Sequence, residues 1–151
     1  MKVLSQVIST FFYVGYLRPA PGTWGSLAAL PIGIYVLIFF DWQTLLALCL
    51  VTFFIGVWAS GYYAGSNHKK DPSEVVIDEV AGQWLALVFV NPLLWELIAA
   101  FALFRLFDIA KPWLIGRLER LPAGWGIMSD DMLAGLFAGI LIMLFRNLQL
   151  F

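Results

Sequence analysis

Long apolar runs, separated by short polar connections, set the pattern of this chain. Five of these runs predict helices, at about 25–40, 44–64, 76–90, 96–110 and 132–148. A membrane helix normally takes about 20 residues to cross a hydrocarbon core of about 30 Å, although shorter runs are tolerated where the bilayer thins. We therefore predict an all-α, polytopic membrane bundle of about five membrane segments. The run at 76–90 opens with two acids and is the one that can instead be partly re-entrant.

The first 17 residues predict a separate interfacial helix, and 18–151 then forms the helical bundle of a single domain. Apolar side chains recur in this first stretch at helical spacing, with polar ones opposite, as in Val3 and Val7 against Ser5 and Ser9. An amphipathic helix of this kind lies in the plane of the membrane interface. The polar interruptions argue against a cleaved signal peptide.

The composition agrees with a membrane protein. Hydrophobic residues make up 62% of the 151 residues and charged residues only 13%, a balance unlike that of a soluble domain. No long run of Lys and Arg is present, which argues against nucleic-acid binding. Cys49 lies in an apolar run and reads as a small buried residue, while His68 reads as a solvated loop residue near lipid headgroups.

The basic residues predict an orientation. The connections at 41–43 and 91–95 contain no Lys or Arg, whereas most bases fall on the alternate side, namely Lys2, Arg18, Lys69, Lys70, Lys111, Arg117 and Arg120. The positive-inside rule then puts the N-terminus, 66–75 and 111–130 in the cytoplasm and the C-terminus outside, with Arg146 as the exception.

Charges interrupt the fourth run where its helix should still be in lipid. Arg105, Asp108 and Lys111 recur at helical spacing on one broad face, and Pro112 ends the helix. An ionisable side chain within a membrane costs about 2.5–3.5 kcal/mol, so it is usually paired, turned inward and functional. This face therefore predicts a site for an anion and a cation.

The predicted orientation brings acids from distant segments to the cytoplasmic interface. These acids are Asp78, Glu79, Asp108, Asp130 and Asp131. Their five negative charges are balanced by only two positive charges, on Arg105 and Lys111, or by three if Arg18 is included. Crowded carboxylates repel one another strongly or take up protons. A divalent cation resolves this excess, and oxygen ligands favour Mg²⁺, then Mn²⁺ or Ca²⁺, over zinc. The alternative is that Asp78 and Asp130 simply cap helices.

The segment from Arg18 to Ser26 contains two prolines and two glycines, which predict irregular backbone until the apolar run begins at Leu27. An ordinary loop in which Thr23 or Ser26 caps the next helix is the simpler interpretation. The sharper one is a phosphate cradle made by free backbone N–H groups, the two hydroxyls and Arg18.

Small and aromatic residues complete the picture. Gly82 and Gly135 each follow an acid by four residues and predict close helix approach beside the site. Five tryptophans near predicted helix ends read as interfacial anchors, namely Trp24, Trp84, Trp95, Trp113 and Trp125.

Four separated motifs resemble those of bacterial phosphatidylglycerophosphatase A. They are Pro21-Gly22-Thr23-Trp24-Gly25-Ser26, Ile77-Asp78-Glu79, Phe104-Arg105 with Asp108-Ile109-Ala110-Lys111-Pro112-Trp113, and Gly126-Ile127-Met128 followed by Asp130-Asp131 and Ala134-Gly135. The resemblance covers nearly the whole chain in the same order. It implies a Mg²⁺-dependent lipid phosphatase of the bacterial inner membrane that converts phosphatidylglycerophosphate to phosphatidylglycerol. The roles of individual acids do not come with the resemblance.

The residues and the resemblance combine into one hypothesis. The five acids hold one or two Mg²⁺ ions, which polarise the phosphate and activate a water. Arg105 and Lys111 neutralise the phosphoryl charge, while Arg18, Thr23 and Ser26 position phosphate oxygens or the glycerol. A covalent route through Asp or Ser is the mechanistic alternative. Two other classes of protein stay open, a small transporter or ion pathway and a non-enzymatic membrane assembly protein.

Overall fold

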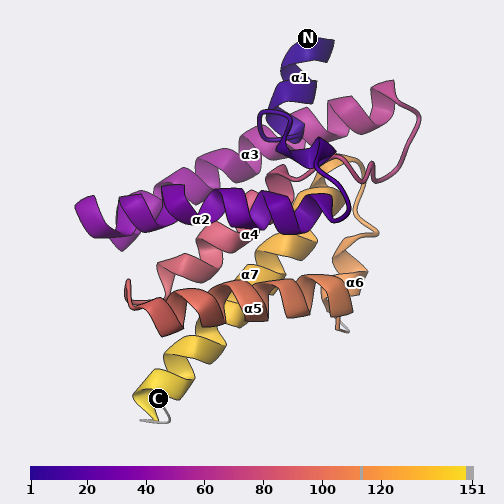
Figure 1. Ribbon diagram of the computed structural model, residues 1–151. Coiled ribbons are helices and arrows are strands. Elements are labelled where there is room, and N and C mark those ends of the chain that lie inside the picture. The colour runs from indigo at the N-terminus through magenta and orange to yellow at the C-terminus, as the bar shows by residue number, and fades with distance from the viewer. Residues whose placement is uncertain (113, 149–151) are drawn as a thin grey trace.

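A computed structural model describes residues 1–112 and 114–148, in which every regular element is a helix (Figure 1). In chain order these are α1 (Lys2–Ser9), the 3₁₀ turn η1 (Val14–Tyr16), α2 (Pro21–Phe39), α3 (Trp42–Ser66), α4 (Ile77–Val88), α5 (Leu94–Ala110), α6 (Ile115–Leu118) and α7 (Gly124–Asn147). The predicted all-α class is therefore confirmed for the described part of the chain.

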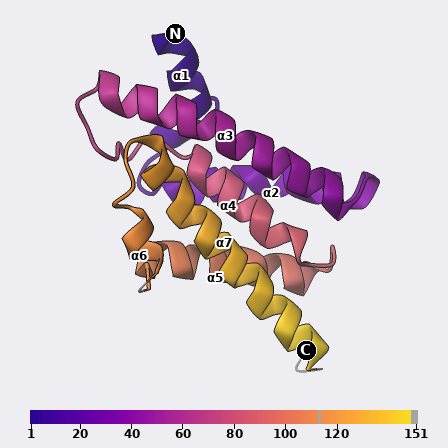
Figure 2. The same ribbon diagram turned by 180° about the vertical axis from the view of Figure 1, so that it is seen from behind.

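The five longer helices alternate in direction, so their ends meet at two opposite ends of the bundle. At one end, on the right in Figure 1, lie the starts of α2, α4 and α7 and the ends of α3 and α5. The short connections at 40–41 and 89–93 lie at the other end. Helix α4 occupies the middle and packs against α2, α3, α5 and α7, as the view from behind also shows (Figure 2).

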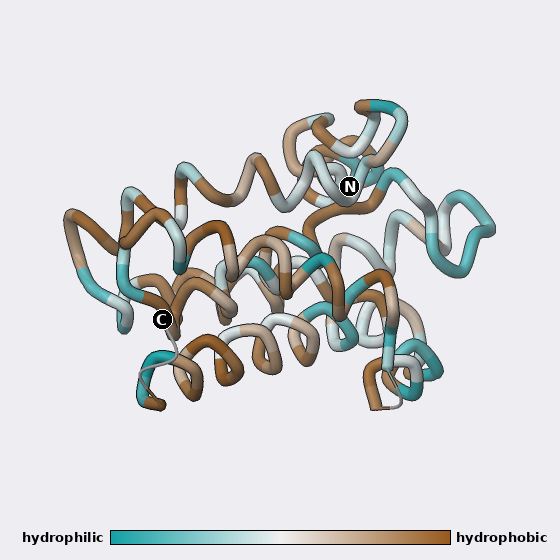
Figure 3. Tube along the Cα trace, turned by 60° about the horizontal axis from the view of Figure 1, so that its bottom comes forward, coloured by the Kyte–Doolittle hydropathy of each residue, from teal (hydrophilic) through white to brown (hydrophobic). Residues whose placement is uncertain are grey.

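In the described part of the chain, three helices are long and apolar enough to cross a membrane, namely α2, α3 and α7 with 19, 25 and 24 residues. Helix α4 has only 12 residues, which at 1.5 Å per residue span about 18 Å, and α5 has 17. The predicted count of about five spans is therefore not confirmed. Hydrophilic residues gather in the loops at the end of the bundle where α2, α4 and α7 start, while the long helices are largely apolar (Figure 3).

The N-terminal helix is shorter than predicted. Helix α1 ends at Ser9, and Phe11, Phe12 and Tyr13 then form a left-handed turn. Its amphipathic pattern is used with the polar side inward, because Ser5 and Ser9 are fully buried while Val3 is 68% exposed. Helix α1 packs on α3, with Ile8 against the core, while Val3 and Leu4 face outward, as expected for a helix whose exposed face meets lipid.

Helices α2 and α7 start several residues earlier than the sequence predicted. Helix α2 begins at Pro21 rather than after the proline- and glycine-rich segment, since proline is well suited to the first position of a helix. Helix α7 begins at Gly124, so Asp130 and Asp131 lie inside the helix and do not cap it. Asp78, in contrast, does lie in the first turn of α4, where the helix dipole stabilises a negative charge.

Helices α4 and α7 pack closely enough to touch backbone to backbone. A Cβ added at Gly135 would overlap the carbonyl oxygen of Gly82, and one added at Gly82 would lie 2.6 Å from the carbonyl oxygen of Asp131. The prediction of close helix approach at these two glycines is confirmed. The contact sets Asp131 of α7 beside the first turn of α4.

The tryptophans divide between surface and core. Trp24, Trp95 and Trp125 are exposed, but Trp84 is buried and donates its indole N–H to the carbonyl oxygen of Ala29 at 2.8 Å. The prediction of an interfacial anchor at Trp84 is therefore wrong, because the central position of α4 turns this residue inward. Trp113 lies outside the described residues.

Arg146, the base that does not follow the positive-inside pattern, forms an ion pair at the opposite end of the bundle. Arg146 Nη1 lies 3.0 Å from Glu96 Oε2, and Glu96 is fully buried. The backbone N–H of Asn91 donates to the same carboxylate at 2.7 Å. These contacts tie the start of α5 to the end of α7, so Arg146 has a structural partner at this end.

Candidate active site

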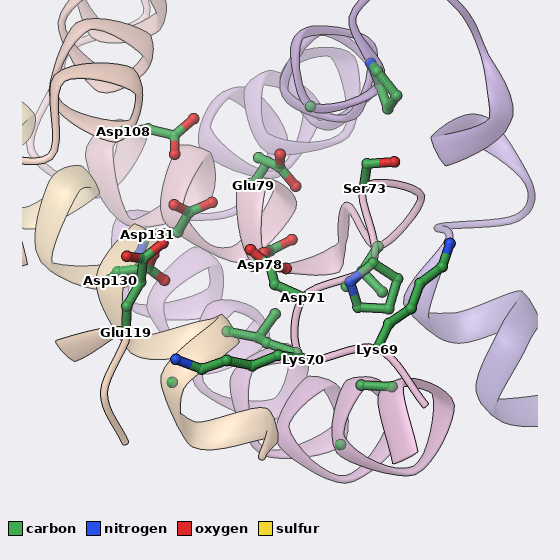
Figure 4. A pocket seen from close by; sticks show the side chains of 18 of the residues that line it. Lys69, Lys70, Asp71, Ser73, Asp78, Glu79, Asp108, Glu119, Asp130 and Asp131 are labelled. Atoms are coloured by element: carbon green, nitrogen blue, oxygen red, sulfur yellow. The ribbon is translucent and has the colours of Figure 1, made fainter. Parts of the chain in front are cut away.

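A pocket of about 600 Å³ opens at the end of the bundle where α2, α4 and α7 start and α5 ends (Figure 4). All five predicted acids line it, together with both predicted bases of the fourth run. These residues are Asp78, Glu79, Arg105, Asp108, Lys111, Asp130 and Asp131. Acids from three separate helices therefore meet at one place, because those helices start or end at the same end of the bundle.

Three of the acids form a compact group. Ligand oxygens of Asp78, Glu79 and Asp131 lie within 4.8 Å of one another. Asp78 Oδ1 and Glu79 Oε2 are buried and have no hydrogen-bond partner in the described part of the chain. Buried carboxylate oxygens without donors are costly unless a cation balances them. The group therefore has the donor chemistry of a site for a hard divalent cation such as Mg²⁺.

Arg105 borders this group on the side of α5. Its guanidinium forms an ion pair with Asp108 one turn along the helix, and its Nη1 lies 3.8 Å from Glu79 Oε1. The same nitrogen is 3.5 Å from the hydroxyl of Ser26, which is fully buried. Arg105 Nε is buried without an acceptor among the described residues, so the side chain keeps one donor unused.

Lys111 joins two elements at the other side of the pocket. Its Nζ donates to Asp130 Oδ2 at 2.8 Å and also contacts Glu119. Burial acts to lower the pKa of Lys111, but the hydrogen bonds to the two carboxylates outweigh it, so this pKa is raised and the lysine stays charged. Lys111 itself follows the end of α5 in a left-handed conformation with φ 42°. The lysine thus fastens the segment after α5 to α7.

The start of α2 closes the pocket against Glu79. A Cβ at Gly22 would lie more than 1 Å inside the ordinary 3.4 Å contact distance from Glu79 Oε1, so only glycine leaves room for that carboxylate. Gly22 lines the pocket, whereas Arg18 and Thr23 do not. Ser26 does not line it either and reaches the site through Arg105. The structure thus brings the backbone of the predicted phosphate cradle to the pocket, but not its predicted side chains.

Sequence reasoning missed one side of the pocket. The loop between α3 and α4 contributes Lys69, Lys70, Asp71 and Ser73, and the segment after α5 contributes Glu119. Asp71 lies close enough to Lys111 and Asp108 for their charges to act on its carboxyl group. The available signal was the charge-rich Lys69-Lys70-Asp71 run shortly before Asp78, which by itself looks like a solvated loop.

The profile of one protein family, described as phosphatidylglycerophosphatase A, matches residues 7–146. The chain belongs to this family. It is 36% identical to phosphatidylglycerophosphatase A of Haemophilus influenzae, with 91% of this chain and 85% of the relative covered. It is 38% identical to phosphatidylglycerophosphatase A of Escherichia coli, with 90% and 80% covered. The predicted resemblance to phosphatidylglycerophosphatase A is thereby confirmed.

Another relative of this chain has a different name. A protein of Bacteroides thetaiotaomicron that bears the provisional name phosphatidylinositol-3-phosphatase is 42% identical, with 95% of this chain and 94% of the relative covered. No solved structure matches the chain. The matched family region includes every acid and base of the pocket described above.

Proposed function

We propose that this protein is a membrane lipid phosphatase that hydrolyses the terminal phosphomonoester of phosphatidylglycerophosphate to phosphatidylglycerol and phosphate. Family membership supports the reaction class. The observation that carries the assignment to this pocket is the buried group of Asp78, Glu79 and Asp131 beside Arg105. A lipid phosphomonoester is a dianion anchored at the membrane, and it needs both a cation site and a basic donor there.

Asp78, Glu79 and Asp131 would hold a Mg²⁺ ion, with Asp108 and Asp130 close by as supporting acids or as ligands of a second ion. A bound divalent cation polarises a phosphoryl oxygen and lowers the pKa of a water molecule. The unpartnered oxygens Asp78 Oδ1 and Glu79 Oε2 support this role. Oxygen-only ligands, with the single histidine in an exposed loop, disfavour zinc.

Arg105 neutralises charge on the phosphoryl group. Its Nε donor is unused, and the edge of the guanidinium formed by Nε and Nη2 can bind two phosphoryl oxygens at once, which an arginine fork does better than a lysine. Asp108 and Ser26 both contact Nη1 and hold the guanidinium in place. Gly22 lines the same pocket at the start of α2, and this end of the helix adds the favourable end of a helix dipole.

We further propose direct attack by water rather than a covalent intermediate on a serine. The hydroxyl of Ser26 donates to the carbonyl oxygen of Gly22 at 2.9 Å and lies behind Arg105, so it is committed to structure. Ser73, which does line the pocket, donates to Glu74 at 3.4 Å. Arg105 is a permanent cation and cannot take a proton from Ser26, and the Glu74 carboxylate beside Ser73 is already engaged by Tyr63 and Lys69, so neither serine has a free base to activate it as a nucleophile.

The site is proposed to face the cytoplasm from the bacterial inner membrane. The pocket end carries the loops 67–76 and 111–123 with most of the basic residues, as the positive-inside rule expects for the inner face. A cysteine introduced at exposed His68 tests this orientation, because Cys49 is buried. Labelling of intact cells by a membrane-impermeant thiol reagent would contradict the proposed orientation, and labelling only after lysis supports it.

The main experiment measures phosphate release from phosphatidylglycerophosphate by the detergent-purified protein. Asp131→Asn removes one charge from the acid group and should lower kcat at least a hundredfold, and EDTA should abolish turnover until Mg²⁺ is restored. Asp41→Asn is the matched control, since Asp41 caps α3 at the opposite end of the bundle and asparagine caps equally well. Full activity of Asp131→Asn, or of EDTA-treated protein, would exclude the proposed cation site.

A phosphorylated phosphatidylinositol is the second candidate substrate, because the Bacteroides thetaiotaomicron relative bears the corresponding name. Both lipids have a phosphomonoester on a polyol that is joined to diacylglycerol through a phosphodiester. The comparison of kcat/KM for the two lipids, in the same detergent, decides between them.

A further inference from the structure

Four cations line the pocket, and three of them are engaged by carboxylates. Lys69 pairs with Glu74 at 3.3 Å, Arg105 with Asp108, and Lys111 with Asp130. Lys70 also lines the pocket, but no carboxylate of the described chain lies within ion-pair distance of its ammonium group. It is thus the pocket cation that remains available to a ligand.

The loop that carries Lys70 is held on both sides. Before it, the backbone N–H of Lys69 donates to the carbonyl oxygen of Ala64 at 3.1 Å. After it, Glu74 accepts hydrogen bonds from Tyr63 and Lys69, each at 3.3 Å. The N–H of Val76 donates to Ser9 of the N-terminal helix at 2.9 Å. The backbone at Lys70 is therefore held at the pocket, and the exposed side chain extends from it.

Lys70 lies at the pocket edge and not within the acid group. Figure 4 shows its side chain extending past Asp71 toward the side of the pocket where Glu119 and Asp130 are labelled, apart from Asp78, Glu79 and Asp108, whereas the amino group of Lys69 points away from these acids. An ammonium group at this edge does not compete with Arg105 for the reacting phosphate. It is placed to bind a second anionic group of the same ligand, one that lies farther from the acid group than the reacting phosphate.

The substrate has such a second anion. In phosphatidylglycerophosphate a glycerol unit separates the reacting phosphomonoester from a phosphodiester, which bears one negative charge. A pocket of about 600 Å³ has room for more than a phosphate group. The net negative charge of the pocket acids would repel an unpaired phosphodiester, so a free cation at the edge is needed to hold it.

We propose that Lys70 binds the internal phosphodiester of the lipid substrate and thereby selects lipids that have a phosphomonoester beyond a phosphodiester. This inference rests on the proposed function. Lys70 contributes to substrate binding and takes no part in bond cleavage. Its loss should therefore weaken binding of the substrate and of the product phosphatidylglycerol, which keeps the phosphodiester, but not of inorganic phosphate.

Lys70→Ala tests the proposal in the full-length protein. We expect its KM for phosphatidylglycerophosphate to rise about tenfold with kcat within twofold of wild type, and inhibition by phosphatidylglycerol to weaken by a similar factor. The inhibition constant of inorganic phosphate should not change. Lys70→Arg should restore most of the affinity. Arg120→Ala is the control for a general loss of surface charge, because Arg120 is exposed, lies in the segment after α5 and does not line the pocket.

Three results would overturn the proposal. They are an unchanged KM in Lys70→Ala, an equal weakening of inorganic phosphate and phosphatidylglycerol, and an equal effect of Arg120→Ala. Failure of the proposed function is distinguishable from all three, since wild-type protein would then release no phosphate from the lipid at all.

Discussion

Gly22 offers a test in which activity and stability should separate. The position lies in the first turn of α2, where Gly22→Ala should stabilise the helix by up to about 1 kcal/mol. The new methyl group, however, would lie more than 1 Å too close to Glu79 Oε1 and 3.1 Å from Arg105 Nη1. Because Glu79 Oε1 is the far end of a flexible side chain, it can move away at small cost to the fold.

That movement should be expensive for catalysis. A shift of more than 1 Å removes Glu79 from the group in which the ligand oxygens lie within 4.8 Å, and a displacement of about 1 Å at an active site can cost about a hundredfold in rate. We expect kcat of Gly22→Ala to fall about a hundredfold while its melting temperature in detergent changes by no more than a few degrees.

The matched control is Gly65→Ala in the last turn of α3, which also lines the pocket but where an added Cβ meets neither the acid group nor any other atom within 4 Å. This variant makes the same chemical change in a helix and should keep wild-type kcat. The reasoning is refuted if Gly22→Ala retains full activity, or if it loses activity only because the protein no longer folds. Phosphate release and thermal unfolding, measured on the same preparations, distinguish these results.

Two further predictions concern the charged side chains. Arg105→Lys should lower kcat at least tenfold without unfolding the protein, because a point charge replaces the guanidinium fork, and unchanged phosphate release would reduce Arg105 to a structural partner of Asp108. Glu96→Ala should lower the free energy of unfolding by about 3 kcal/mol, because it leaves Arg146 and the N–H of Asn91 without their carboxylate. Its kcat per folded molecule should match wild type, and a selective loss of activity in assays at constant folded fraction would contradict this.

The meeting of the acids could be predicted because it depends on helix direction more than on packing detail. Asp78 starts a helix, Asp108 ends one, and Asp131 lies near the start of another, so alternation alone brings them to one end. This holds although, among the described residues, only α2, α3 and α7 are long and apolar enough to span a membrane. The number of spans depends on helix length and burial, which the apolar pattern alone does not separate.

The starts of α2 and α7 could not be predicted from residue types, because proline and glycine have two opposite uses. Both residues break helices in isolation, but Pro21 begins α2 and Gly22 is required by the approach of Glu79. Lys70 was missed for a related reason. A lysine in a polar loop looks solvated in the sequence. Only the fold places this loop at the pocket edge, and the position of Lys70 along the chain does not predict that placement.

Charge pairing divides acids that the sequence presents as equivalent. Asp130 and Asp131 are neighbours on α7, yet Asp130 binds Lys111 while Asp131 joins Asp78 and Glu79. Successive residues of a helix point about 100° apart, so one face of α7 can anchor the segment after α5 while the next completes the acid group. Asp108 is likewise neutralised by Arg105. The charge left for a cation therefore lies mainly on the three acids whose oxygens converge, and this makes them the first candidates for metal ligands.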